Sequence, residues 1–197
     1  MKKSFIIIFT VMMFAFQTNI YGQNLKSTVS MDAGISLAGT LIKTGIYLLD
    51  GYDENDIVDY KSIPVINGAY DYMINDWLSA GIAGGYQSFD FTFQEGDINL
   101  SRMNIAARAL FHYGKSDKLD MYSGIRLGAT IWNSEMTWNT SDPTLESFFN
   151  DKYVGSFFRT QLVALGIRGY FTDNIGANVE FAIGSPYYLS GGVNFRF

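Results

Sequence analysis

The chain of 197 residues contains no cysteine, three prolines and a single histidine. Without cysteine it has no disulfide framework, no Cys-ligated zinc module and no thiol nucleophile. Charged residues make up 17% of the chain, against about 25% in ordinary soluble domains. The 16% of aromatic residues excludes intrinsic disorder, and the net charge of −5 argues against a nucleic-acid-binding protein.

The first 22 residues have the pattern of a secretory signal peptide. Lys2 and Lys3 form its positive start, and Phe5 to Phe16 is apolar except for Thr10. This stretch is shorter than the roughly 20 apolar residues of a membrane-spanning helix, and no later segment reads as one. We therefore expect a signal peptide over residues 1–22, cleavage after Gly22, and one domain over residues 23–197.

From residue 27 onward, apolar and polar residues alternate with a period of two, which predicts strands. Within the segment 98–113, for example, Met103 and Ile105 share one face, and Asn104 and Arg108 share the other. The pattern predicts eight strands, at residues 28–38, 63–73, 77–92, 98–113, 119–136, 157–172, 175–184 and 188–197.

The connections between these segments alternate in length. Short turns at 75–76, 114–118 and 173–174 contrast with two long connections, 39–62 and 137–156. Short turns on one side and long loops on the other are typical of outer-membrane barrels. The predicted fold class is all-β, an eight-stranded antiparallel up-and-down transmembrane β-barrel. Segments 39–48 and 56–62 are rich in β-forming residues and are expected to extend strands beyond a membrane; ten strands, with an extra hairpin in 39–62, stay an alternative.

Alternation alone does not say which face points inward, because a soluble lipocalin-like barrel alternates equally well. All six arginines lie inside the predicted strands, and all eight lysines lie outside them. The polar face otherwise carries mainly glycine, serine, alanine and asparagine. Small residues and multiply hydrogen-bonding arginines suit a narrow lumen. We therefore expect the uncharged apolar face to contact lipid.

The inward parity predicts a charge network in the lumen. Three acids and five arginines share this face: Asp32, Asp71, Glu180, Arg102, Arg108, Arg126, Arg168 and Arg196. Buried charges must be paired or hydrated, so we expect ion pairs such as that of Glu180 with Arg168 on the adjacent strand. The network can be read as an anion-preferring constriction or as a structural plug; the narrow bore of eight strands favours the plug.

Aromatic residues gather at the short-turn ends of the predicted strands, which favours an interfacial girdle. The residues concerned are Tyr70, Tyr72, Trp77, Phe111, Tyr113, Tyr122, Tyr170, Phe171, Phe195 and Phe197. The last two belong to the ending Gly-Gly-Val-Asn-Phe-Arg-Phe.

The signal peptide, the eight alternating segments, the short turns and this ending together resemble the small outer-membrane β-barrel proteins, the OmpA/OmpX/OmpW-like porin-fold group. The resemblance covers about residues 25–197. It implies the fold of a transmembrane β-barrel. It implies export to the outer membrane of a Gram-negative bacterium. It also implies contact with outer-membrane lipid and with the barrel assembly machinery, for which Phe195 and Phe197 would be the signal.

Evidence for catalysis or metal binding in the sequence is weak. The lone imidazole, His112, lies near a short turn on the inward parity, away from outer-leaflet substrates. The acidic residues Asp50, Asp53, Glu54, Asp56 and Asp59 lack the spacing of a calcium loop, so neither a metal nor a cofactor is predicted.

We expect a non-enzymatic protein that serves envelope structure, surface interaction or limited small-solute passage. An extracellular ligand would contact loops 39–62 and 137–156, the second of which carries Trp138, Phe148, Phe149 and Tyr153. The alternative is a secreted or periplasmic lipocalin-like carrier of a hydrophobic ligand, which would place the apolar face inside the barrel.

Overall fold

The computed structural model describes residues 26–48, 57–93, 96–114, 116–138 and 152–197. The predicted signal peptide, most of the acidic loop and most of the loop 137–156 lie outside this part of the chain. The elements in chain order are β1 (Ser27–Ile35), α2 (Ala38–Leu48), β2 (Ile57–Ser62), β3 (Val65–Asn75), β4 (Leu78–Phe93), β5 (Gly96–His112), β6 (Leu119–Trp138), β7 (Lys152–Tyr170), β8 (Ile175–Gly184) and β9 (Leu189–Arg196).

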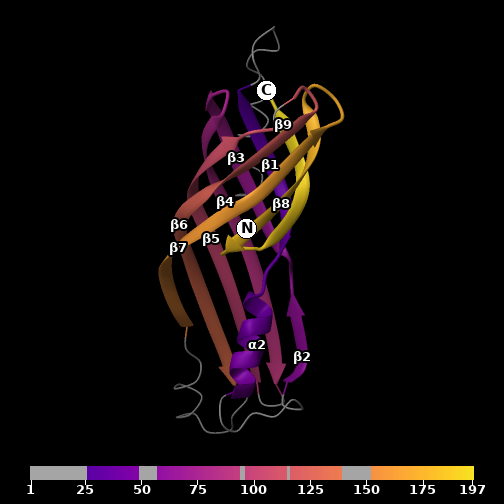
Figure 1. Ribbon diagram of the computed structural model, residues 1–197. Coiled ribbons are helices and arrows are strands. Elements are labelled where there is room, and N and C mark those ends of the chain that lie inside the picture. Colours follow the sequence, from indigo (N-terminus) through magenta and orange to yellow (C-terminus); the bar gives the residue numbers. More distant parts are fainter. Residues whose placement is uncertain (1–25, 49–56, 94–95, 115, 139–151) are drawn as a thin grey trace, which may run out of the picture.

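Eight of the strands close into an antiparallel barrel (Figure 1). Each of them pairs with its neighbours along the chain, β4 pairs with β5, and β9 returns to β1. The amide and carbonyl groups of Ser27 and Phe197 exchange two hydrogen bonds of 2.9 Å at the end of this last seam. The predicted eight-stranded barrel is confirmed. The ten-stranded alternative is wrong, because β2 pairs with β4 alone.

The four middle strands are about twice as long as those on the other side of the barrel. Strands β4 to β7 contain 16 to 20 residues, whereas β1, β8 and β9 contain 8 to 10. The long strands therefore continue beyond the closed barrel, away from the short turns, as a curved sheet that β2 widens (Figure 1, lower half). We call this part of the molecule the extension.

Segment 38–48 is a helix, so the expectation of a strand there is wrong. Ala38 and Ile42 pack against Phe89, Phe91 and Phe93 on the inward face of β4. The Ser36 hydroxyl accepts a 3.0 Å hydrogen bond from the amide of Ala38 at the start of the helix. Tertiary packing against this aromatic surface overrides the local β propensity of the segment. The expectation for 56–62 agrees with β2.

The side-chain parity read from the sequence matches the two faces of the barrel strands. On β5, Asn104 and Arg108 are buried inside, whereas Met103 and Ile105 are 51% and 61% exposed on the outside. The closed barrel thus has a polar interior and an apolar exterior, the reverse of a soluble globular domain. Within the described residues, no helix has the length and hydropathy needed to cross a membrane.

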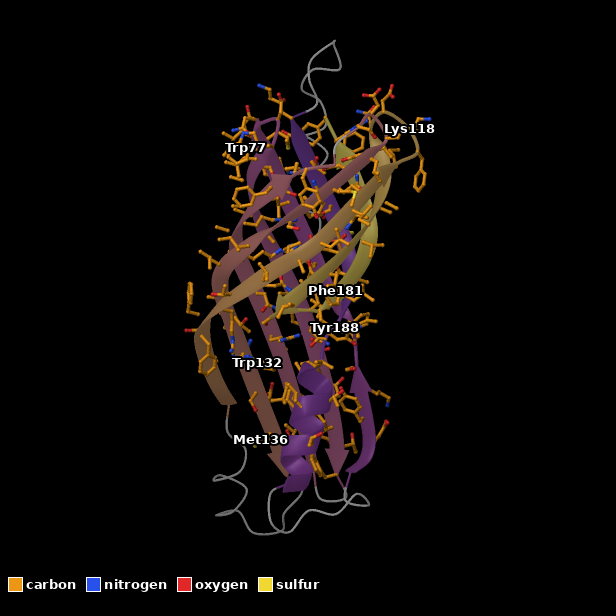
Figure 2. All side chains as sticks on the ribbon, viewed as in Figure 1. Trp77, Lys118, Trp132, Met136, Phe181 and Tyr188 are labelled. Carbon is orange, nitrogen blue, oxygen red and sulfur yellow. The ribbon has the colours of Figure 1, made fainter. Side chains whose placement is uncertain are left out.

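Most of the predicted aromatic girdle lies on the outer surface at the short-turn end. Tyr72, Trp77 and Phe171 are 46%, 55% and 74% exposed, and Figure 2 shows Trp77 beside this end of the barrel. The assignment is wrong for Tyr122 and Tyr170, which are 1% and 6% exposed. Both have the inward parity of their strands, so their rings fill the lumen.

Candidate functional site

The centre of the lumen is occupied by the carboxylate of Glu180, which projects inward from β8 and is 2% exposed. One oxygen accepts hydrogen bonds from Arg126 at 2.6 Å and from the Tyr187 hydroxyl at 2.7 Å. The other accepts from Arg108 at 3.2 Å and from the Tyr122 hydroxyl at 3.1 Å. Four donors from three segments of chain, namely β5, β6 and the connection between β8 and β9, thus hold one buried charge, as a buried carboxylate requires.

A second group of ion pairs continues from Glu180 toward the short turns. The Asp71 carboxylate accepts a hydrogen bond from Arg168, and its Oδ1 lies 3.0 Å from Arg108 Nε in an electrostatic contact without good hydrogen-bond alignment. Arg168 also lies 3.6 Å from Asp120. The result is an alternating chain of three carboxylates and three guanidinium groups: Asp120, Arg168, Asp71, Arg108, Glu180 and Arg126.

This arrangement differs from the pairing expected from the sequence. Arg168 bonds to Asp71 and faces Asp120, and the arginines on Glu180 are Arg108 and Arg126. The expected pair of Glu180 with Arg168 is therefore wrong. Strand adjacency does not choose partners here, because long side chains reach across the bore of a narrow barrel.

Two of the predicted lumen residues stand apart from the ion-pair chain. Asp32 is buried but accepts hydrogen bonds only from the amides of Asn178 and Asn67 among the described residues. Arg196 lies at the short-turn mouth, where it donates to two turn carbonyls and stacks on Tyr170 at 3.8 Å. Arg196 therefore closes the mouth and takes no part in the central network.

A serine, a histidine and an aspartate also contact one another at the short-turn end of the lumen. His112 Nε2 lies 2.9 Å from the Ser79 hydroxyl, and its Nδ1 lies 2.7 Å from Asp120 Oδ1. These contacts have the order of a hydrolase triad. Ser79 is 0% exposed, however, and does not line the two cavities described below. The three residues are packed together inside the short-turn end of the lumen.

The sequence reading missed Asp120 and Ser79 as lumen residues, although both positions carried a signal. Asp120 has the parity of Tyr122, and Ser79 that of Ala83 and Gln87, all of which face inward. Both positions lie within the predicted strands 77–92 and 119–136, so the parity of these strands was sufficient to place them in the lumen.

Little free space remains between these side chains. The cavity that adjoins Arg126, Asn104 and Thr130 inside the barrel has a volume of about 20 Å³. This volume holds about one water molecule. At this level, the side chains of the network leave little room in the lumen.

The polarity of both sheet faces inverts where the closed barrel passes into the extension. On the outer face of β5, Asp97 and Asn99 precede Met103 and Ile105, with Ser101 between the two pairs. Strand β4 changes in the same way, from exposed Tyr86 to exposed Asp90. We call this level the polarity boundary.

The inner face changes in the opposite sense at the same level. On the closed-barrel side of the boundary, β4 and β5 present Gln87 and Arg102 inward. On the extension side, they present Phe89 and Leu100. Helix α2 covers these apolar side chains, and Trp132 stacks on Phe89 with ring centroids 6.1 Å apart. The extension is thus built like a water-soluble domain, with an apolar inside and a polar outside.

Exposed charges on the extension follow the same rule. On β2, Lys61 lies 2.6 Å from Asp59, and this ion pair lowers the pKa of the Asp59 carboxyl below its ordinary value. Lys61 and Lys152 are the described lysines that lie within strands, and both belong to the extension. Among the described residues, no cluster of three or more metal-ligating side chains occurs.

Comparison with protein-family models gave no match, and comparison with curated protein sequences gave none either. Among solved structures, Ail, the attachment invasion locus protein of Yersinia pestis, matches with a TM-score of 0.50 and 14% identity, over 89% of this chain and 100% of Ail. A structure of Ail with the heparin analogue sucrose octasulfate matches with the same values. The outer membrane protein OprG of Pseudomonas aeruginosa matches with a TM-score of 0.51 and 10% identity, over 91% of this chain and 99% of OprG. At these identities the likeness is one of fold, and the chain has the fold of small eight-stranded outer-membrane barrels.

Proposed function

We propose that the chain is an integral, non-enzymatic protein of the bacterial outer membrane that serves envelope structure and surface interaction. The observation that carries this proposal is the paired inversion of both sheet faces at the polarity boundary. An apolar exterior around a charged interior is stable in lipid, and the reverse arrangement beyond the boundary is stable in water. A lipocalin-like carrier would need an apolar pocket inside the closed barrel, where this chain has Glu180, Arg108 and Arg126.

The orientation follows from the same features. The short turns and the aromatic residues beside them would face the periplasm, and the extension would stand outside the cell. Strands β4 to β7 would then carry the extension and the loop 137–156 to any surface partner. Ail is described with a heparin analogue, but the outer face of this extension bears Asp59, Asp90, Asp97 and Glu135. An acidic surface does not favour a sulfated ligand.

Passage of solutes is a minor role in this proposal. The ion-pair chain across the lumen and the small cavity of about 20 Å³ beside Arg126 support a plug rather than a pore. We also propose that residues 1–22 direct export and that Phe195 and Phe197 form the assembly signal. The rings of Phe195 and Phe197 lie at the end of the β1–β9 seam with their centroids 5.8 Å apart and their planes tilted by 31°.

Cell fractionation tests the location directly. We expect recovery with the outer membrane, a chain that begins at Gln23 by mass spectrometry, and lower gel mobility after heating in mild detergent. The heat-dependent shift reports a closed barrel that survives unheated detergent. Recovery as a soluble periplasmic protein without a shift would overturn the membrane proposal.

A further inference from the structure

A lateral cavity of about 640 Å³ lies at the polarity boundary, beside the connection between β8 and β9. Leu37 and Leu41 line it from the start of α2, Phe181 and Ile183 from β8, and Trp132 from β6. Figure 2 shows Phe181 and Tyr188 together at this height of the molecule, with Trp132 nearer the extension. The volume falls within the range of about 300–1,000 Å³ that is typical of small-molecule sites.

The cavity exists because the barrel wall is incomplete at this level. Strand β8 ends at Gly184, which pairs with Gln161 of β7. Strand β7 continues to Lys152 and pairs there only with β6. On the other side, β1 ends at Ile35 and the chain turns into α2. The cavity therefore opens to the side, between α2 and the part of β7 that belongs to the extension. Figure 1 shows α2 in the lower half of the molecule, beyond the ends of β8 and β9.

Two arginines line this otherwise apolar cavity, and neither has an acidic partner among the described residues. Arg102 is held by neutral groups: its Nη2 donates to the Ser36 hydroxyl and the Pro186 carbonyl, each at 2.6 Å, and both Nε and Nη2 donate to Gln87. Its Nη1 has one long contact of 3.5 Å. Arg159 is exposed, and the contact recorded for it is with the ring of Phe157 at 5.6 Å.

Arg102 differs from the buried arginines of the lumen, because it has no carboxylate partner among the described residues. Arg108, Arg126 and Arg168 each contact at least one carboxylate. Arg102 is as deeply buried as they are, at 4% exposed, and it has a second arginine for a neighbour instead. Two guanidinium groups at one apolar cavity repel each other, and an anion between them would remove this repulsion.

The position of the cavity at the polarity boundary indicates what the non-anionic part of the ligand is. Arg102 precedes Met103, which is the first exposed apolar residue of β5 on the closed-barrel side of the polarity boundary. Phe181, Ile183, Leu37 and Leu41 are 49%, 60%, 56% and 67% exposed, so the cavity continues onto the apolar outer surface. A ligand that satisfies both parts has an anionic end at the arginines and an alkyl chain that lies toward the lipid.

We propose that this cavity binds an amphiphile from the outer leaflet, with its terminal phosphate or carboxylate on Arg102 and Arg159 and its alkyl chain against Leu37, Leu41 and Phe181. At Arg102, Nη1 is the nitrogen left for the anion, because Nε and Nη2 already donate to neutral groups. Arg159 can offer its planar guanidinium to either oxyanion through two parallel hydrogen bonds. The site would give the barrel a lipid bound at a fixed position, in addition to the lipid that surrounds it.

Quenching of Trp132 fluorescence by a doxyl-labelled stearate tests the proposal, because Trp132 lines the cavity. The full-length mature protein would carry Trp77→Phe and Trp138→Phe and be refolded in a non-ionic detergent at fixed concentration. We expect saturable quenching that dodecyl phosphate reverses and that dodecyltrimethylammonium does not. Arg159→Gln should weaken binding by about tenfold or more, the effect of losing a hydrogen bond to a charged group.

Arg196→Gln is the matched control, since Arg196 lies at the opposite mouth of the barrel and should leave binding unchanged. Equal competition by the cationic amphiphile would show an apolar groove without an anion site, and would overturn the proposal. Competition by inorganic phosphate as strong as that by dodecyl phosphate would show a site for soluble anions, and would also overturn it. The heat-dependent gel shift of each variant checks folding separately, so failure here leaves the outer-membrane proposal standing.

Discussion

At Glu180, one carboxylate joins side chains from three other segments of the chain, with two arginines and two tyrosines as donors. The parity of β8 is sufficient to predict that this residue faces inward. Its partners are not predictable, because Arg108 and Arg126 lie 72 and 54 residues away in sequence. Side-chain reach across the closed bore decides such pairs, and a one-dimensional pattern carries no information on it.

Replacement of Glu180 by Gln should lower the free energy of unfolding by about 3–5 kcal/mol, as expected when one partner of a buried ion pair is removed. Arg126 would lose the one carboxylate that it contacts among the described residues and keep the neutral contact with Gln161 at 3.1 Å. Unfolding by urea in detergent micelles measures the change. Asp97→Asn, on the exposed face of β5, should change stability by less than about 0.5 kcal/mol. Equal effects of the two variants would contradict a structural role for Glu180.

Helix α2 shows where prediction from local sequence failed at the scale of an element. Its Ile, Thr and Tyr residues favour strands, but the inner faces of β4, β5 and β6 already form a sheet whose aromatic surface needs cover. A helix covers such a concave surface without an edge partner. The positions and lengths of the long connections can be predicted from the sequence. The surface that α2 covers cannot, because it forms only when β4, β5 and β6 come together.

Gly39 is the point at which α2 approaches the sheet most closely. A Cβ atom at this position would lie 2.0 Å from the Tyr60 hydroxyl and 3.1 Å from the Phe89 ring, whereas a Cβ at Gly45 meets nothing within 4 Å. Gly39→Val should therefore displace the helix and expose Trp132, and Gly45→Val should not. Iodide quenching of Trp132 fluorescence, with the other two tryptophans replaced by Phe, measures the difference. Unchanged quenching in Gly39→Val would argue against the docked position of α2.

The polarity boundary on β5 gives a second prediction at this scale. Ile105→Arg places a charge on the apolar outer face and should cost about 2–4 kcal/mol in a bilayer. Asn99→Arg, on the same face beyond the boundary, should cost about 0–1 kcal/mol. Folding into phospholipid vesicles at increasing urea concentration measures both. Similar costs would mean that the boundary does not coincide with the edge of the lipid.

For the whole molecule, a filled bore predicts low conductance. The wild-type protein should show no steady current in a planar bilayer, because the network residues leave a cavity of only about 20 Å³. The double variant Arg126→Ser, Glu180→Ser removes one ion pair of the network, including the Arg126 side chain that lines this cavity, and should open a measurable channel. A wild-type current as large as that of the variant would show that the network is no plug.

The architecture of the whole barrel is the part of the structure that the sequence predicts best. Strand number, closure and the lengths of the connections follow from alternation and turn spacing, which are properties of neighbouring residues. The lateral cavity was not predictable, because it results from a difference in strand length between the two sides of the barrel, as between β7 and β8.

The polarity boundary also has a mechanical consequence for the position of the protein along the membrane normal. Successive outward residues of a strand lie about 6.6 Å apart. Movement outward by one such step would carry Met103 and Tyr86 from lipid into water, and movement inward by two steps would carry Asn99 and Asp90 into lipid. The short-turn end has amphipathic tyrosine and tryptophan side chains that tolerate such changes. A thinner or thicker bilayer should therefore be accommodated at the short-turn end, while the polarity boundary keeps a fixed depth.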